Sequence, residues 1–179
     1  IGMVHQHFML VPSLTVAENM VLGMAPRKGL FIDHAKAVAI TKEYAEKYNL
    51  HVEPEAKVMD IPVGMKQKVE ILKALVRGAK ILILDEPTSM LDPLAARSLL
   101  DTVERINREL GVAVLLTEHR LDAVFPVCDR VLVMDGGKLR IDGAPAKIAA
   151  QLAAETEKER LYYGLPAPVR ICGGKPIIK

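Results

Sequence analysis

The sequence predicts an α/β domain built on a parallel β-sheet, and three observations support this. Residues 81–84 (Ile-Leu-Ile-Leu) and 112–116 (Val-Ala-Val-Leu-Leu) are wholly apolar runs of strand length. The segment between them begins with Asp92 and Pro93, a helix cap and first residue, and ends just before Gly111. Apolar strands that lack alternation and are separated by a helix are typical of a parallel sheet covered on both faces.

The other elements are predicted from caps, turns and periodicity. Thr15 and Glu18 have capping-box spacing, Asp33 can cap the next helix, and Gly78 can close a third. The Gly136-Gly137 pair predicts a turn. In chain order we expect a strand at 1–6, helices at 15–23, 33–48 and 66–76, a short helix at 120–125, strands at 130–134 and 138–141, and a helix from 146 to about 160.

Composition restricts the function classes. The 179 residues suit one domain, or a domain with a small subdomain. The formal charge of +2 is too balanced to predict binding to nucleic acid or anionic lipid. Two cysteines, Cys128 and Cys172, form no disulfide framework. No apolar run reaches the roughly 18 residues of a membrane helix, so we expect membrane contact only through a partner.

Two adjacent carboxylates follow the strand at 81–84. Side chains at the carboxyl end of a buried parallel strand meet the crevice where α/β sheets bind ligands. One of these two carboxylates, Asp85 and Glu86, could hold Mg²⁺ there, and the other could orient or deprotonate an attacking water. The alternative is a strand that simply ends in surface acids.

Five motifs together resemble the nucleotide-binding subunit of ABC transporters, over nearly the whole chain. In chain order they match the Q-loop (4–6, Val-His-Gln), the LSGGQ signature (61–68), the Walker B strand with its glutamate (81–86), the D-loop (89–92, Ser-Met-Leu-Asp) and the H-loop (116–119, Leu-Thr-Glu-His). The resemblance implies the P-loop NTPase (ABC ATPase) fold, a RecA-like parallel sheet with an α-helical subdomain. The expected domains are 1–11 (Q-loop strand), 12–78 (helical subdomain with the signature), 79–150 (Walker B, D-loop and H-loop core) and 151–179 (C-terminal helix and tail).

The resemblance also implies roles for individual residues. Glu86 would be the general base, and Asp85 would act on Mg²⁺. His119 would hydrogen-bond the γ-phosphate of ATP; without the resemblance it would be a surface histidine. Gln6 would touch Mg²⁺ and the attacking water and sense the transmembrane partner. Asp92 would cap its helix and make the D-loop contact across a dimer.

The signature segment departs from the family pattern. Pro62 stands where the family has a Ser that donates to the γ-phosphate held by the opposite subunit, and proline offers neither a hydroxyl nor an N–H. Gly64 still allows close approach of the backbone. A weakened composite site and a tolerated substitution both stay open. His5 and His7 share one strand face, but a metal site there would need more ligands.

No G-x-x-x-x-G-K-[ST] loop occurs in these residues. The family places it several tens of residues before Gln6, so we expect the chain to be an N-terminally truncated fragment that is inactive alone. A catalytically silent remnant is one alternative, and a non-transport ABC ATPase of DNA repair or translation is another.

Two parts of the chain resemble different importers. Residues 1 to about 86 resemble the ATPases of sugar and nucleoside importers, and residues from 92 onward resemble energy-coupling-factor ATPases, which import vitamins and related micronutrients. The implied partners are transmembrane permease subunits and a second ATPase subunit, at the cytoplasmic face of the cell membrane, with ATP and Mg²⁺ as cofactors and no nucleic acid.

Overall fold

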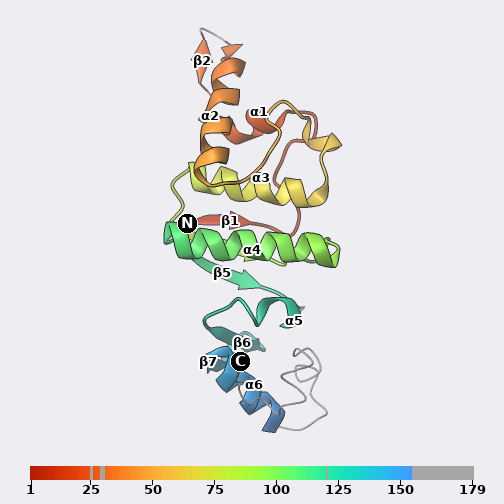
Figure 1. Cartoon of the computed structure of the whole chain (residues 1–179), viewed down its shortest axis with the longest axis vertical. Helices are drawn as coiled ribbons and strands as arrows, with labels where there is room; N and C mark the ends of the chain where they lie inside the picture. The colour runs from red at the N-terminus through yellow and green to blue at the C-terminus, as the bar shows by residue number, and fades with distance from the viewer. Residues whose placement is uncertain (25, 29–30, 120, 155–179) are drawn as a thin grey trace. The chain divides into compact units, whose positions relative to one another are not determined.

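The computed structural model describes residues 1–24, 26–28, 31–119 and 121–154, which fall into two compact units, Ile1–Thr117 and Glu118–Lys179 (Figure 1). The elements of the first unit are β1 (Gly2–Val4), α1 (Val16–Val21), β2 (Arg27–Lys28), β3 (Phe31–Ile32), α2 (His34–Lys47), η1 (Val58–Asp60), α3 (Val63–Val76), β4 (Ile81–Asp85), α4 (Pro93–Leu110) and β5 (Ala113–Thr117). The elements of the second are α5 (Leu121–Val124), β6 (Val131–Asp135), β7 (Lys138–Gly143) and α6 (Pro145–Ala154).

A three-stranded parallel sheet forms the centre of the first unit and confirms the predicted fold class. Its order is β1-β4-β5, so segments about 80 residues apart in sequence lie side by side. Val4, Leu84 and Leu116 are aligned across the three strands and lie on the face that packs into the core. On the opposite face Met3 and Leu115 are each 48% exposed.

Helices α3 and α4 contact each other and pack on the core face of this sheet, α3 against β1 and α4 against β5 (Figure 1). The approach of α3 depends on Gly2, because a Cβ there would lie 2.7 Å from the Cβ of Ala74. The buried residues of α4 recur every three or four positions, as expected for an amphipathic helix: Ala96, Leu99, Leu100, Val103 and Ile106.

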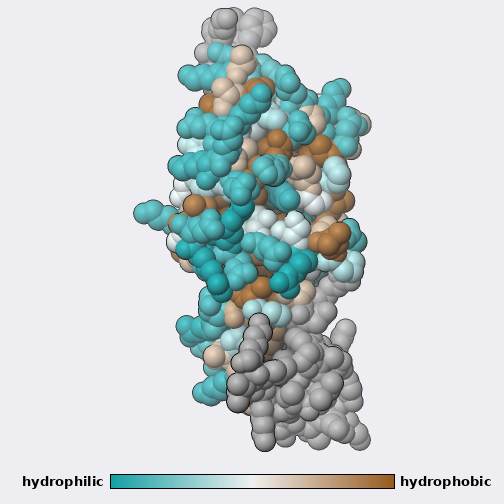
Figure 2. Space-filling model, viewed as in Figure 1, coloured by the Kyte–Doolittle hydropathy of each residue, from teal (hydrophilic) through white to brown (hydrophobic). Residues whose placement is uncertain are grey.

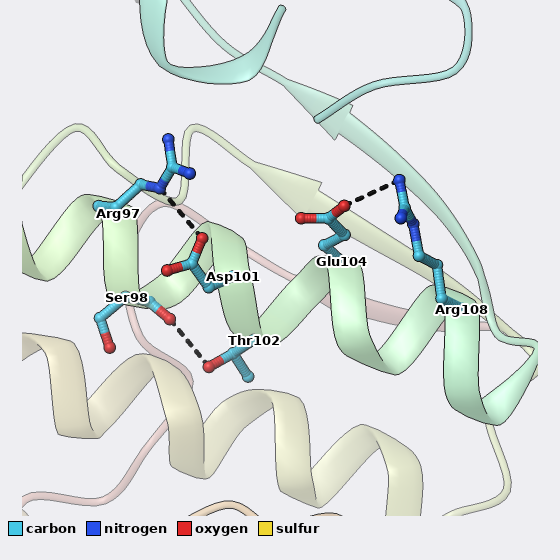
Figure 3. Close-up of polar contacts among 6 residues, drawn as sticks. All are labelled: Arg97, Ser98, Asp101, Thr102, Glu104 and Arg108. Atoms are coloured by element: carbon cyan, nitrogen blue, oxygen red, sulfur yellow. Dashed lines mark hydrogen bonds and ion pairs between the residues drawn. The ribbon is translucent and has the colours of Figure 1, made fainter. Parts of the chain in front are cut away.

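The outer face of α4 is mainly hydrophilic (Figure 2), although Leu94 in its first turn is 81% exposed. Two ion pairs with i,i+4 spacing lie on it, Arg97–Asp101 at 3.0 Å and Glu104–Arg108 at 2.9 Å (Figure 3). Such exposed pairs stabilise a helix by only about 0.3–0.5 kcal/mol each. The helix is therefore held mainly by its buried face.

The helical part that precedes α3 is built as the capping signals predict. Thr15 and Glu18 form a complete capping box at the start of α1. Asp33 caps α2 by accepting a hydrogen bond from the backbone N–H of Lys36. At the other end of α2, Arg105 of α4 donates to the carbonyls of Tyr48 and Asn49, which would otherwise lack helical partners.

Helix α3 begins at Val63, three residues earlier than predicted, and Pro62 is its N-cap. The carbonyl of Pro62 accepts from the N–H groups of Met65 and Lys66, which makes these the first helical hydrogen bonds. Proline fits this position because its fixed φ suits a helix entry and no N–H is required of it. Gly64 is accommodated in the first turn.

The second unit is a β-hairpin with a helix packed on it. Strands β6 and β7 are antiparallel, and the turn between them places Gly136 and Gly137 at φ of 53° and 74°. Among the described residues of this unit, Phe125, Ile148 and Ala149 are the buried members of its apolar cluster. The sequence predicted both strands but not that β6 pairs with β7 in a sheet separate from β1-β4-β5.

The last described helix, α6, is described as far as Ala154. Its predicted continuation to about residue 160 and the predicted tail after Tyr163 lie outside the described residues. Within the described part of the chain, no helix combines the length and the apolar character that crossing a bilayer requires.

Candidate functional site

Three segments place polar side chains at one edge of the parallel sheet. Asp85 is the last residue of β4, and Thr117 is its register partner at the end of β5. Gln6 lies two residues beyond the end of β1. Because all three strands are parallel, their carboxyl ends meet at this edge, where α/β sheets bind ligands.

Thr117 connects both acidic residues to the neighbouring strand. Its hydroxyl donates to Oδ1 of Asp85 at 2.7 Å. The backbone N–H of Glu86 is directed at the same residue, 3.1 Å from its carbonyl oxygen and 3.2 Å from its hydroxyl oxygen. These bonds hold Glu86 at a φ of 44°, in the left-handed region that non-glycine residues rarely adopt.

Gln6 contacts Glu86 directly. Its Nε2 donates to Oε2 of Glu86 at 2.9 Å, although 80 residues separate them in sequence. The parallel pairing of β1 with β4 brings them together. The structure thus assembles Gln6, Asp85 and Glu86, which the sequence predicted as site residues, and adds Thr117.

The turn after Glu86 is tightly bonded. The hydroxyl and the N–H of Ser89 both donate to the carbonyl of Glu86, at 2.8 and 3.2 Å. The buried Gln67 of α3 donates its Nε2 to the carbonyl of Pro87. The turn that follows Glu86 is therefore held by hydrogen bonds within the turn and by one hydrogen bond from α3.

Asp92 and Gly64 lie outside this group of side chains. Oδ1 of Asp92 accepts from the N–H groups of Leu94 and Ala95 at 2.9 and 3.0 Å, which confirms it as the N-cap of α4. A Cβ at Gly64 would lie 3.8 Å from a methyl carbon of Leu91, an ordinary van der Waals distance. Packing against the described residues therefore does not require glycine at position 64.

His119 belongs to the second unit, two residues after the end of β5. Its side chain is exposed, and its backbone N–H lies 3.3 Å from Oε2 of Glu118. Its role at the γ-phosphate stays a prediction. Among the described residues, no group of three or more His, Cys, Asp or Glu side chains could hold a metal ion, so His5 and His7 gain no further ligands.

The residues at the sheet edge fit Mg²⁺ by the chemistry of their donors. Mg²⁺ is bound through one or two carboxylates, with several waters and substrate phosphates completing its shell. Asp85 supplies a carboxylate, and the hydroxyl oxygen of Thr117 lies 2.7 Å from it. Gln6, whose side chain is bonded to Glu86, can add a neutral amide oxygen. A dedicated cage of protein ligands is not needed for such a site.

Comparisons with known proteins show which family the chain resembles. Residues 1–89 match the family model described as "ABC transporter". The nucleoside import ATP-binding protein NupA of Lactococcus lactis is 47% identical over 138 residues, 77% of this chain and 27% of that protein. The chain belongs to the ABC transporter ATP-binding family. The ribose import ATP-binding protein RbsA of a Chelativorans species is 37% identical over 99% of this chain and 31% of its own length.

ABC ATPase structures share the fold. The structure of cbiO1 from Clostridium perfringens, part of the ABC transporter complex cbiONQ, superposes with a TM-score of 0.69 at 23% identity, over 91% of this chain and 65% of that one. The ABC transporter cassette MJ0796, solved as a dimer, gives a TM-score of 0.63 at 23% identity over 81% of this chain and 62% of that one. The chain spans about 27–37% of the length of the curated import proteins that it matches.

Two contributors to the site were missed from sequence. Thr117 ends an apolar strand, where a threonine is ordinary. Its contact with Asp85 depends on the register of β4 and β5, which the sequence does not show. Gln67 lies in α3, a helix that was recognised from its apolar positions. A signal was available for Gln67, since it falls between core residues of α3 where a polar side chain needs a partner.

Proposed function

We propose that this chain supplies the hydrolytic and coupling portion of the ATP-binding subunit of an importer, and that the whole subunit hydrolyses ATP to drive uptake. The hydrogen bond between Gln6 and Glu86, beside Asp85 and Thr117, carries this proposal. It joins the Q-loop to the Walker B glutamate, the pair that the family uses at its hydrolytic centre.

In this mechanism Glu86 is the general base. Its carboxylate accepts the proton of the water that attacks the γ-phosphorus, while the amide of Gln6 fixes the orientation of that carboxylate. Asp85, Gln6 and Thr117 would hold Mg²⁺, which when bound neutralises charge on the phosphates. His119 would donate a hydrogen bond to the γ-phosphate and release it after hydrolysis.

A second ATPase subunit, identical or different, would complete the nucleotide site. Gly64 is a candidate for the contact with the opposite subunit. A Cβ at this position would meet the described residues at ordinary van der Waals distances, so their packing does not explain why a glycine stands here. Asp92 would add a contact across the dimer while it caps α4. Pro62 has no side-chain hydrogen bond to give at the start of α3, which favours a weakened composite site in such a pair.

The coupling surface would lie next to Gln6. A groove of about 310 Å³ in the first unit is lined by Gln6, His7, Phe8, Leu10, Lys66 and Met90, among others. Exposed Met9 and Met59 add flexible apolar side chains, which adapt well to a helical partner. A permease subunit would dock there, and so would hold the chain at the cytoplasmic face of the membrane.

The helical subdomain of this subunit would span residues 12–78, inserted between the sheet segments 1–11 and 79–150. The curated relatives import nucleosides and sugars, which favours a substrate of that kind over a vitamin or related micronutrient. The permease and capture partners would select the substrate itself.

The test uses the longer protein that carries these residues together with a P-loop. We expect Glu86→Gln to lower ATP hydrolysis by about 100-fold or more and to leave ATP binding intact, since it removes only the base. Glu109→Gln, on an exposed turn of α4, is the control and should keep the wild-type rate. A Glu86→Gln protein that hydrolyses ATP as fast as the wild type would rule out this mechanism.

A catalytically silent subunit that pairs with an active one is the second candidate. Pro62 at the N-cap of α3 favours it, because the signature serine is replaced by a residue with no donor. The same longer protein separates the two: a silent subunit would bind ATP yet show no hydrolysis that Glu86→Gln could reduce.

A further inference from the structure

The segment that follows Gln6 is held by its backbone at Met9 and at Val11. Nζ of Lys73 on α3 donates to the carbonyl of Met9 at 3.1 Å. Asn19 on α1 takes both polar groups of Val11: its Oδ1 accepts from the N–H at 2.8 Å, and its Nδ2 donates to the carbonyl at 3.1 Å. Side chains of two helices therefore hold residues 9–11, the anchored segment, at two backbone positions.

Asn19 is fully buried, and both polar atoms of its side chain are hydrogen-bonded. Its Nδ2 donates also to the carbonyl of Thr15 at 3.0 Å, so one amide group joins the start of α1 to the anchored segment. An apolar side chain would be the ordinary occupant of a fully buried position, since a buried amide destabilises the fold unless it is hydrogen-bonded. The amide at position 19 is therefore explained by the backbone that it holds.

Residues 6–8 contrast with the anchored segment that follows them. In the part of the chain that the structure describes, none of their backbone groups is hydrogen-bonded. The side chain of Phe8 packs against the core, but such packing is not directional. The path of this loop therefore depends on its two ends, which are β1 on one side and the anchored segment on the other.

Gln6 is the residue of this loop that reaches the sheet edge. Its Nε2 donates to Oε2 of Glu86 at 2.9 Å. Gln6 lies three residues before Met9 and five before Val11, so the connection to the anchored segment is short. A shift of the anchored segment would therefore change the position of the Gln6 side chain.

From these contacts we infer that Asn19 and Lys73 are positioning residues. By holding the backbone of residues 9–11 on α1 and α3, they set where Gln6 meets Glu86. A movement of these two helices would in this way reach the carboxylate that we propose as the base. The significance for hydrolysis rests on the proposed function, whereas the positional link can be measured without nucleotide.

The test uses the 179-residue chain labelled with ¹⁵N. Asn19→Ala deletes the amide group without adding bulk to a buried position. We expect the Val11 amide proton to exchange with solvent about tenfold faster or more, because its hydrogen bond is lost. We also expect the Nε2 resonances of Gln6 to move toward their positions in Glu86→Ala, the reference in which the acceptor is absent.

Thr41→Val separates positioning from general stability. Thr41 is as buried as Asn19, and its hydroxyl donates to the carbonyl of Ala37 within α2 rather than to the anchored segment. We expect this variant to unfold at a lower urea concentration than the wild type, while the Gln6 resonances keep their positions. If Asn19→Ala leaves those resonances unchanged, or if Thr41→Val moves them as far, the inference is wrong.

Lys73→Met removes the other anchor, and it decides the question if Asn19→Ala does not fold. Lys73 is half-buried, and methionine keeps a long flexible side chain, so the core stays intact. We expect the Gln6 resonances to move toward the Glu86→Ala reference, and resonances that stay in place would overturn the inference. None of these results depends on nucleotide. A longer protein in which Glu86→Gln hydrolyses ATP at the wild-type rate would contradict the proposed function and leave the positional link standing.

Discussion

Glu86 has an unfavourable backbone conformation at the position where the chemistry is proposed. A left-handed φ costs a non-glycine residue on the order of 1–2 kcal/mol, so other contacts must hold it. Thr117 supplies them through its carbonyl and its hydroxyl. The sequence could place Asp85 and Glu86 at a strand end, because an apolar run stops there. It could not show the strain at Glu86, which depends on pairing with a strand some 30 residues away.

The hydroxyl of Thr117 can be tested by an isosteric change. Thr117→Val removes the donor to Asp85 and one acceptor for the N–H of Glu86, and we expect the free energy of unfolding to fall by about 1 kcal/mol. Urea unfolding of the 179-residue chain measures this. Thr102→Val is the matched control, because that hydroxyl donates only to the carbonyl of Ser98 on the exposed face of α4 (Figure 3). Equal losses in the two variants would contradict the structural role of Thr117.

The carboxyl group of Glu70 predicts a pH dependence. Burial raises its pKa above the ordinary value of 4.5, against the opposing effects of Lys73, the Met9 backbone, His5 and Arg77. A carboxyl whose folded pKa is raised stabilises the fold fully below the unfolded pKa, and this contribution is lost as pH rises through the folded pKa. The wild type should therefore lose stability relative to Glu70→Gln as pH increases above about 4.5.

Urea unfolding at a series of pH values measures that difference. Glu43→Gln, at an exposed position of α2, is the control for the same replacement of a carboxyl by an amide. A Glu70→Gln difference that varies with pH no more than that of the control would show that the buried carboxyl does not change its proton affinity on folding.

At the scale of elements, the sequence predicted caps and turns correctly where the contacts that form them join residues close together in the chain. The capping box at Thr15, the cap at Asp33 and the Gly136-Gly137 turn are all confirmed, because each depends on residues within four positions. The start of α3 was predicted three residues late, since Pro62 and Gly64 suggested irregular chain. Nothing in the sequence indicated that β6 and β7 form a two-stranded sheet of their own, because the sheet that a strand joins is decided by packing between distant segments.

Asp92 is the N-cap of α4, and two substitutions separate the effect of its cap from the effect of its charge. Asp92→Ala removes the acceptor for Leu94 and Ala95 and should cost about 1 kcal/mol of stability, whereas Asp92→Asn keeps an acceptor and should cost only a few tenths. Asp101→Ala, which loses only a surface ion pair, is the control (Figure 3). If Asp92→Asn is as costly as Asp92→Ala in urea unfolding, charge rather than capping dominates at this helix.

At the scale of the whole molecule, the arrangement of the first unit could be predicted only through the family resemblance. The order β1-β4-β5 joins segments whose separations no local pattern encodes. Once the order is given, the meeting of Gln6 with Glu86 follows from parallel strands that end at one edge. The five motifs named Gln6, Asp85 and Glu86 as candidates that the structure places at one sheet edge, but they did not predict the contacts of Thr117 and Gln67 that hold this edge.

The 179 residues are expected to bind nucleotide weakly. The 179 residues contain no Gly-rich loop with its lysine, the part of this fold that grips the phosphates. Asp85 and Glu86 would repel a triphosphate unless Mg²⁺ accompanied it. We therefore expect isothermal titration of this chain with Mg-ATP to give a Kd weaker than about 1 mM, which corresponds to less than about 4 kcal/mol of binding free energy. The longer protein that carries a P-loop is the positive control. Micromolar binding by the 179 residues alone would mean that the sheet edge, or the start of α3, holds phosphate without the loop that the family uses.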